Sequence, residues 1–247
     1  MSALLRVCVA GSGGKMGRAL IEAVNADDAL ELANAFDVGG NVASAIAGGD
    51  VVIDFTRPEG TLSHLGPCVK LKKAMVIGTT GFSAAQHKEI EEAGKKIPIV
   101  LSPNFAVGVN AVFKLAETAA RILGDDFDVE IIEAHHRQKV DAPSGTALRL
   151  GEIIASAAKQ KLSTVAVHGR HGDTGVRPRK QIAFHAIRGG DIVGEHTVIF
   201  AGAGERVEVT IRSQSRMTYA LGALRAAKFL RGKKTGFYSM EDVLGLK

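Results

Sequence analysis

One segment of the sequence concentrates side chains that can bind anions and move protons. The stretch "EAHHRQKVDAPSGTAL", residues 133–148, places His135, His136, Arg137 and Lys139 within five positions. Histidine changes its charge near neutral pH and is suited to donate or accept a proton, whereas lysine and arginine attract anions. These residues predict an anion site with proton donors beside it.

The same segment ends at the start of a predicted helix. Pro143 restricts the entry to this helix and Ser144 is a candidate N-cap. Gly145 and Thr146 then offer backbone N–H groups and a hydroxyl at the positive end of the helix. A small dicarboxylate could bind Lys139 and one histidine through one carboxylate and the helix start through the other, which leaves the second histidine to move a proton. A phosphate would fit the same groups nearly as well.

The histidine pair also admits other interpretations. His135 and His136 are consecutive at the end of a predicted strand, so their side chains should point to opposite faces. They would be poor joint metal ligands, and neither a Cys-rich run nor an HxxxH spacing lies near them, so we expect no metal site. Considered alone, the pair could be structural, with one histidine packed and the other facing solvent.

A glycine-rich turn predicts a second anion site. The stretch "VAGSGGKMG" follows a predicted strand and opens a predicted helix, with Gly11, Gly14 and Gly17 plus an additional Gly13. Glycines let backbone N–H groups come close to a pyrophosphate, and the helix start supplies partial positive charge. The usual GxGxxG spacing is met only in its first two glycines, because Met16 stands at the third position. We interpret the turn as dinucleotide-binding, with an ordinary glycine turn as the alternative.

The residue that follows the second predicted strand bears on the choice of dinucleotide. Asp37 lies twenty residues beyond Gly17, where a carboxylate can accept hydrogen bonds from the adenosine ribose hydroxyls. The next residues, "VGG", cannot neutralise a ribose 2′-phosphate, so the pattern favours NADH over NADPH. Lys15 could partly restore NADPH binding, and Asp37 could alternatively cap the loop.

Three further turns follow predicted strands: "FTRPEGT", "VIGTTGF" and "SPNFAVGVN". Ligands of open parallel sheets bind beyond the carboxyl ends of the strands, so these turns are expected to line the nicotinamide end of the site. Any one of them alone is more often an ordinary turn, and only the series favours this interpretation.

The pattern of apolar residues predicts an α/β protein with two domains. The first hundred residues alternate β-branched runs with helical patterns, which is typical of a Rossmann-type dinucleotide-binding domain with a parallel sheet. A second α+β domain should contain the strand "DFDVEIIEAHH", a helix over about residues 145–161 and three strands that alternate polar and apolar residues as antiparallel strands do. The helical stretch "MTYALGALRAAKFLRG" should pack back on the first domain. We assign residues 1–105 and 217–247 to the dinucleotide-binding domain and residues 106–216 to the substrate-binding domain.

A basic, turn-rich segment, "HGRHGDTGVRPRKQ" at residues 168–181, is interpreted mainly as a solvated mobile loop. The competing hypothesis is a redox sensor that contacts nucleic acid through this loop. The sequence has no helix-turn-helix signature, and its aromatic content of 5% provides few stacking platforms. We therefore expect no nucleic-acid partner.

The overall composition is that of a globular cytoplasmic protein. The chain has 247 residues, 46% of them hydrophobic, and a net charge of +5 that favours anionic partners in general. Cys8 and Cys68 lie in apolar surroundings, where cysteine is usually a small hydrophobe, and two thiols do not make a disulfide scaffold. Neither a signal peptide nor a membrane span is evident, so we expect a soluble protein with no membrane partner.

These motifs together resemble a known family. The stretches "EAHHRQKVDAPSGTAL", "GSGGKMG", "DFTRPEGT", "GTTGF", "SPNFAVGVN" and "IRGGDIVGEHTVIFAGAGERVEVT" are similar to those of the dihydrodipicolinate reductases of bacterial lysine biosynthesis, now called 4-hydroxy-tetrahydrodipicolinate reductases. The similarity covers nearly the whole chain in the same order. It implies reduction of a cyclic dicarboxylate by NADH or NADPH with loss of water, a cytoplasmic location, and a homotetramer formed through the second domain's sheet.

The resemblance also implies roles for individual residues. His135 would donate and accept the proton, and Lys139 would be a second proton donor that also binds substrate. His136, Gly145 and Thr146 would bind the substrate carboxylates. The residues implied to contact the cofactor are Gly11, Ser12, Gly13, Gly14, Lys15, Met16, Asp37, Gly78, Thr79, Thr80, Ser102, Pro103, Asn104 and Phe105.

The chain departs from the family's pattern at two places, both after the second predicted strand. Val38 stands where NADPH-tolerant relatives often have arginine, and the connection from Asp37 to "VVIDF" is shorter than in many relatives.

A cyclic imine that accepts hydride needs a proton from a positioned acid, which agrees with the His135 segment. Domain closure with hinges near Phe105 and Arg216 should bring the donor carbon to the substrate. A dehydrogenase of a sugar or amino-acid semialdehyde is the alternative enzyme.

Overall fold

The computed structural model describes residues 3–246, which form two compact units. The first unit comprises the described residues up to 107 together with those from 216 onward, and the second comprises Gly108–Ser215. Each unit has its own sheet and its own hydrophobic core. The two sheets are the frameworks that hold the predicted functional segments.

The first unit is built on a six-stranded parallel sheet with the order β11-β5-β4-β3-β1-β2. Its strands are β1 (Leu5–Ala10), β2 (Leu30–Phe36), β3 (Val51–Asp54), β4 (Ala74–Ile77), β5 (Pro98–Leu101) and β11 (Gly236–Tyr238). Its helices are α1 (Lys15–Asn25), α2 (Val42–Ile46), α3 (Pro58–Leu71), α4 (Ala84–Gly94), α8 (Met217–Leu230) and α9 (Met240–Leu244).

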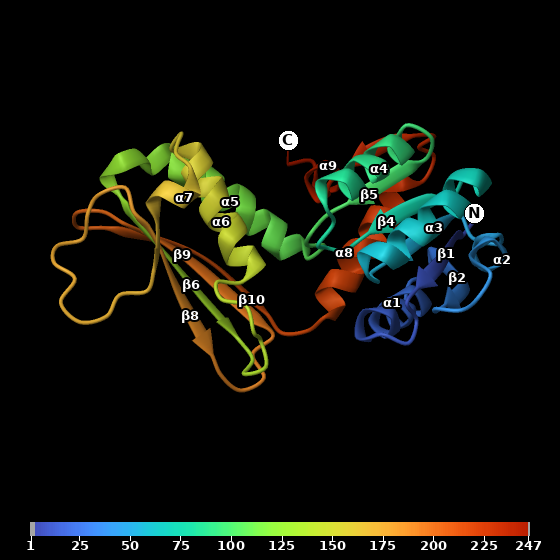
Figure 1. The fold of residues 1–247 in the computed structure, drawn as a ribbon, viewed down its shortest axis with the longest axis horizontal. Coiled ribbons are helices and arrows are strands. Elements are labelled where there is room, and N and C mark those ends of the chain that lie inside the picture. Colours follow the sequence, from blue (N-terminus) through green and yellow to red (C-terminus); the bar gives the residue numbers. More distant parts are fainter. Residues whose placement is uncertain (1–2, 247) are drawn as a thin grey trace. The chain divides into compact units, whose positions relative to one another are not determined.

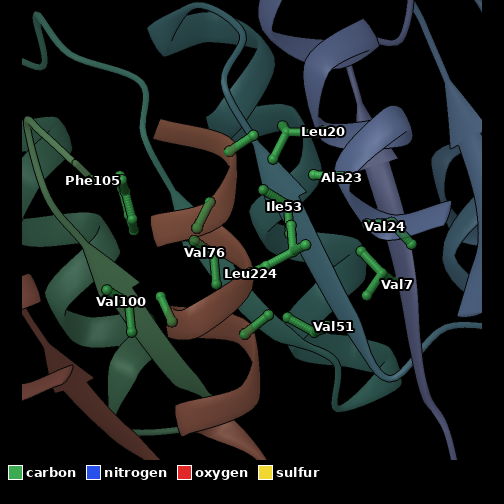
Figure 2. Packing of buried hydrophobic residues seen from close by; sticks show 14 of the residues in the cluster. Val7, Leu20, Ala23, Val24, Val51, Ile53, Val76, Val100, Phe105 and Leu224 are labelled. Atoms are coloured by element: carbon green, nitrogen blue, oxygen red, sulfur yellow. The ribbon is translucent and has the colours of Figure 1, made fainter. Parts of the chain in front are cut away.

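The central strands of this sheet are buried on both faces, which explains their continuous runs of apolar residues. In β3, Val51 and Ile53 belong to the core that contains residues of α1 and α8, whereas Val52 belongs to the core that contains residues of α3 and α4. Successive side chains of a strand point to opposite faces, so one short strand contributes to both cores. Figure 2 shows Leu224 of α8 beside Ile53 on the first of these faces.

Helix α8 packs in the core of the first unit, although the chain reaches it only after the second unit. Ala220, Ala223, Ala226 and Ala227 are fully buried, and their small side chains let α8 lie close to the sheet and to α1. The helix therefore belongs to the first unit although more than a hundred residues of the second unit precede it.

The second unit is built on a mixed five-stranded sheet with the order β10-β9-β6-β8-β7. Helices α5 and α6 both pack on one face of this sheet (Figure 1). The elements of the unit, in chain order, are α5 (Val107–Leu123), the 3₁₀ turn η1 (Gly124–Asp126), β6 (Asp128–His135), α6 (Gly145–Ala157), α7 (Leu162–Val165), β7 (Ala166–His168), β8 (Ile182–Arg188), β9 (Gly194–Ala201) and β10 (Arg206–Ser213).

The two sheets confirm the predicted fold class, with two local corrections. Strand β8 pairs parallel with β6, because the connection between them runs through α6, while β9 and β10 are antiparallel as predicted. The predicted helix over residues 145–161 ends at Ala157, and Lys159 two residues later adopts a left-handed backbone conformation with φ of 57°. A left-handed residue cannot continue a right-handed helix.

Both cysteines are buried and free, as expected for small hydrophobic residues. Burial raises the pKa of Cys68 to about 12, so its thiol stays protonated and unreactive. Among residues 3–246, no helix has the length and apolar character needed to cross a lipid bilayer.

Candidate active site

The glycine turn joins β1 to α1 and has the geometry of an anion cradle. Gly11 adopts a φ of 74°, and its N–H and that of Ser12 both donate to the carbonyl of Phe36. A Cβ atom on Gly17 would lie 2.1 Å from the carbonyl oxygen of Gly11, so this close approach requires glycine. Gly14 is the N-cap of α1, and no described side chain caps the helix. The N–H groups of the first turn are therefore left for an anion.

Changing Gly17 to alanine should displace this turn. We expect the dissociation constant for NADH to rise about tenfold or more, because the added methyl group must push backbone away from backbone. Gly48→Ala is the matched control, since a Cβ atom there meets nothing within 4 Å. Titration of NADH fluorescence measures both variants, and equal affinities would contradict the expectation.

Asp37 holds the glycine turn from the end of β2. One of its carboxylate oxygens accepts the N–H of Gly13 at 2.9 Å, and the other accepts the N–H of Val38 at 2.9 Å. These hydrogen bonds hold the pKa of Asp37 below its usual value. Asp37 thus caps the loop, which the sequence left as the alternative to ribose binding. Its side chain remains exposed, so a ribose could still reach it.

A buried carboxylate organises the turns at the carboxyl ends of β3 and β4. Asp54 is fully buried, accepts from the N–H and the hydroxyl of Thr56, and lies 2.7 Å from Nδ1 of His64. Thr61 donates its hydroxyl toward Asp54 and lies 2.9 Å from the hydroxyl of Thr79. Thr79, a predicted cofactor residue, is therefore fixed by a network that sequence analysis missed.

The turns after β4 and β5 lie together at the same edge of the sheet. Thr79, Thr80 and Pro103 line one cavity of about 520 Å³, with Phe82 and Phe237 as apolar neighbours. Two other predicted cofactor residues are placed differently. The hydroxyl of Ser102 donates to the carbonyl of Asn104, and the side chain of Phe105 is buried in the core against Phe55. Only the backbone of Phe105 remains for a ligand.

In the second unit, the last residues of β6 hold the first histidine of the pair. Glu133 and His135 are two residues apart in the strand and so share the face that packs on α6. Nδ1 of His135 lies 2.6 Å from Oε2 of Glu133, and its Nε2 has no hydrogen bond with any residue in the described part of the chain. Burial lowers the pKa of His135, while the hydrogen bond to Glu133 opposes this shift.

Ser144 caps α6 and prepares its first turn for an anion. The Ser144 hydroxyl accepts the N–H of Ala147 at 3.2 Å, as predicted for an N-cap, and its own N–H donates to Glu133. Gly145 and Thr146 are the first two helical residues, and Gly145 is exposed. Their N–H groups lie at the positive end of the helix, where a carboxylate is favoured.

The second histidine and the lysine complete the segment. Nδ1 of His136 is buried without a hydrogen-bond partner among residues 3–246, which is costly for a polar atom and typical of a binding site. Nζ of Lys139 donates to Asp141 at 2.7 Å, and the Lys139 side chain is only 21% exposed. The backbone N–H of Lys139 donates to the carbonyl of His136, so the two residues belong to one tight turn.

Sequence analysis missed three residues that surround His135. Arg188 of β8 donates from both terminal nitrogens to Glu133, and Nε2 of His196 on β9 lies 2.9 Å from the Ser144 hydroxyl. The alternation of strand side chains could have identified Glu133, because it stands two positions before His135. Arg188 and His196 become neighbours only through the pairing of β6 with β8 and β9.

The basic loop at residues 168–181 is more firmly attached than predicted. Arg170 binds both oxygens of Glu130, at 2.9 and 2.8 Å, and Arg177 binds Glu130 and Asp128. His185 also lies 2.7 Å from Glu130. The interpretation as a simply solvated loop is therefore wrong for Arg170 and Arg177, because a partly buried carboxylate on β6 pairs with them.

A parallel sheet with a glycine cradle, together with a separate unit that carries clustered histidine and lysine side chains, is typical of two-domain dinucleotide-dependent oxidoreductases. Comparisons with known proteins specify the family. The models named "Dihydrodipicolinate reductase, N-terminus" and "Dihydrodipicolinate reductase, C-terminus" match residues 5–105 and 108–244. The chain belongs to the dihydrodipicolinate reductase family.

Individual relatives agree with this assignment. The 4-hydroxy-tetrahydrodipicolinate reductase of Aromatoleum aromaticum is 56% identical over 98% of this chain and 96% of its own length. That of Dechloromonas aromatica is 54% identical over 98% of both chains. Among solved structures, the dipicolinate-bound dihydrodipicolinate reductase of Paenisporosarcina sp. TG-14 has a TM-score of 0.81 at 26% identity, covering 97% of this chain and 99% of its own.

Family membership confirms three predictions made from the sequence: the resemblance, the fold class and the reaction. The family's reaction is the reduction of 4-hydroxy-tetrahydrodipicolinate in the diaminopimelate route of lysine biosynthesis, with NAD(P)H as the reductant. The alternative of a sugar or semialdehyde dehydrogenase is excluded by the same comparisons.

Proposed function

We propose that this chain reduces 4-hydroxy-tetrahydrodipicolinate to tetrahydrodipicolinate with loss of water, using His135 and Lys139 as proton donors and NADH as the preferred reductant. The observation that supports the proposal most directly is the position of His135. Its Nδ1 is held by Glu133, its Nε2 has no hydrogen bond with any described residue, and it lies in the segment that contains Lys139 and the start of α6.

The first unit fits a nicotinamide dinucleotide. The Gly11–Gly17 cradle, the uncapped start of α1 and the turns at Thr79 and Pro103 are arranged along the carboxyl edge of one parallel sheet. When bound, the reduced nicotinamide supplies the hydride. Residues 1–105 and 217–247 would form the cofactor-binding domain, and residues 106–216 the substrate-binding domain, with closure about hinges near Phe105 and Arg216.

The second unit would bind the dicarboxylate through the His136–Thr146 segment. The N–H groups of Gly145 and Thr146 would hold one carboxylate, and His136 and Lys139 the other. Lys139 would direct its ammonium group, which has three donors and now binds Asp141, to the substrate carboxylate. His135 would then deliver its proton from Nε2 as the ring accepts hydride.

The assay that tests this function follows NADH oxidation with freshly generated 4-hydroxy-tetrahydrodipicolinate. Turnover should be inhibited competitively by pyridine-2,6-dicarboxylate, a planar dicarboxylate that offers the same two anionic groups. Absence of NADH oxidation with this substrate, in protein that binds NADH, would overturn the proposal.

The preference for NADH rests on Asp37 and Val38. Replacing the fully exposed Val38 with arginine should lower KM for NADPH about tenfold and change KM for NADH much less, because guanidinium binds a 2′-phosphate through charge-assisted hydrogen bonds. Val176→Arg, at an equally exposed valine of the second unit, is the matched control. Steady-state kinetics with both dinucleotides measure the change, and an unaltered NADPH constant would refute the assignment.

We also propose a cytoplasmic homotetramer formed through the second unit's sheet. The face of this sheet opposite α5 and α6 bears Ile132, Ile199 and the half-exposed Ile187, and no helix described within residues 108–215 covers it. Apolar side chains on a sheet face without a covering helix are typical of subunit interfaces. Light scattering of the purified protein measures the mass, and a monomer would contradict the proposal.

A further inference from the structure

One buried carboxylate is the hub of the polar contacts around His135. The Glu133 side chain is fully buried. Its Oε2 lies 2.6 Å from Nδ1 of His135 and 2.7 Å from one terminal nitrogen of Arg188. Its Oε1 accepts from the Ser144 N–H at 3.1 Å and from the other terminal nitrogen of Arg188 at 2.6 Å. Both oxygens are therefore fully engaged.

This arrangement decides which nitrogen of His135 is available for chemistry. An ionised carboxylate can only accept hydrogen bonds, so Nδ1 of His135 must carry a hydrogen in both the neutral and the charged form. Protons are then exchanged at Nε2, the ring atom that has no partner among residues 3–246. The same logic orients the histidine of hydrolase triads, where an acidic residue fixes the tautomer.

Arg188 keeps Glu133 ionised in its buried position. Burial alone would raise the pKa of Glu133, but the hydrogen bonds from Arg188 and His135 outweigh it and hold this pKa below its usual value. Arg188 also donates to the carbonyl of Asp141, which ties β8 to the loop that contains Lys139. Arg188 is a positive charge near His135, so it disfavours the imidazolium that Glu133 favours.

The other groups that face His135 are His196 on β9 and Lys139 on the loop after β6. The two histidine rings lie 5.1 Å apart, edge to face. Burial lowers the pKa of His196 to about 4, so this ring is neutral at pH 7. Because the Ser144 hydroxyl accepts from Ala147, its hydrogen is free to donate to Nε2 of His196. Glu133 is then the anion that favours the His135 imidazolium, and Lys139 and Arg188 are the cations that disfavour it, Lys139 more strongly than Arg188.

We propose that Glu133 and Arg188 are a positioning pair for His135: Glu133 fixes its tautomer and favours its protonated form, and Arg188 opposes that preference while locking the carboxylate in place. The same carboxylate holds the N–H of Ser144 and so fixes the start of α6 relative to the proton donor. This inference rests on the proposed role of His135, but the orientation and proton affinity of the ring are measurable without substrate.

The test compares the pH dependence of kcat/KM in Glu133→Gln and Arg188→Met. Activity that requires protonated His135 falls as pH rises through its pKa. This fall in activity is the alkaline limb of the pH–rate profile. Loss of the carboxylate should move the limb to lower pH, and loss of the guanidinium should move it to higher pH, each by about one unit. Glu133→Gln should also lower kcat about 10²-fold or more, because an amide can present its NH₂ to Nδ1 and stabilise the wrong tautomer.

Conservative variants separate charge from geometry. Arg188→Lys keeps the positive charge but loses the pair of hydrogen bonds to the two oxygens of Glu133. The alkaline limb of its pH–rate profile should therefore stay near that of the wild type, while kcat falls. Glu152→Gln and Arg149→Met, at an exposed ion pair on α6 of the same unit, are the matched controls and should shift nothing. If the pKa of the His135 ring moves in the same direction in the Glu133 and Arg188 variants, or does not move in either, the inference is overturned.

NMR titration of labelled histidine in the free enzyme distinguishes this inference from the proposed function. Wild-type His135 should be protonated at Nδ1 when neutral, and its pKa should fall in Glu133→Gln and rise in Arg188→Met. If the ring titrates this way while the pH–rate profiles do not follow it, the positioning pair is supported and the proton-donor role of His135 fails. A neutral ring protonated at Nε2 in the wild type overturns the positioning pair.

Discussion

Replacing His135 with glutamine is expected to lower kcat about 10²- to 10⁴-fold, the usual contribution of a general acid. Glutamine keeps a polar side chain of similar size but cannot deliver a proton at neutral pH. Affinity for NADH should not change, because the glycine cradle belongs to the other unit. The rate of NADH oxidation at saturating substrate measures the loss, and fluorescence titration measures the affinity.

His171→Gln is the control for this substitution. His171 is an exposed residue of the loop at residues 168–181, and the variant should retain wild-type turnover. Lys139→Ala should reduce kcat and raise KM together, since Lys139 is assigned both proton donation and substrate binding. If His135→Gln and Lys139→Ala both kept wild-type turnover, the assigned roles would be wrong even though the family assignment stands.

The largest expected effect on stability concerns Glu130, the carboxylate that binds Arg170, Arg177 and His185. Burial would raise its pKa, but the hydrogen bonds from these three residues lower it from 4.5 to about 2. A shift of that size corresponds to on the order of 3 kcal/mol. Glu130→Ala should therefore lower the free energy of unfolding by about 2 to 3 kcal/mol at pH 7, and chemical denaturation measures it.

The effect of Glu130 should depend on pH in a defined direction. Because its folded-state pKa is depressed, its contribution is fully present above the unfolded-state pKa and is lost as pH falls from about 4.5 toward 2. The difference in Tm between wild type and variant should shrink over that interval. Glu152→Gln, at an exposed ion pair with Arg149, should have little effect at any pH. A difference in Tm between the wild type and Glu130→Ala that stays constant down to pH 3 would refute this account.

Much of the fold followed from the periodicity of apolar residues. The runs that became β1, β3, β4 and β5 are mostly apolar because these inner strands are covered on both faces, and α8 showed a long helical pattern. The strands that sequence analysis missed, β7 and β11, are only three residues long, too short for any period to be visible. The direction of β8 was also missed, since alternation shows which residues share a face and not which way the neighbouring strand runs.

Part of the candidate site could be predicted from the sequence, and part of it could not. The segment that contains His135, Lys139 and Thr146 is continuous in sequence, so residue types and spacing were enough to find it. The contacts of Glu133 with Arg188 join residues 55 positions apart, and those of Ser144 with His196 join residues 52 positions apart. Such contacts depend on strand register, which no local pattern specifies.

The order in which the two units appear along the chain has a consequence for biogenesis. The first unit needs α8, β11 and α9, which the ribosome delivers only after the whole of the second unit. Residues 108–215 are contiguous and can close on their own core while the dinucleotide sheet still lacks an edge strand and a buried helix. During translation, the unit that begins second is therefore the one able to finish first.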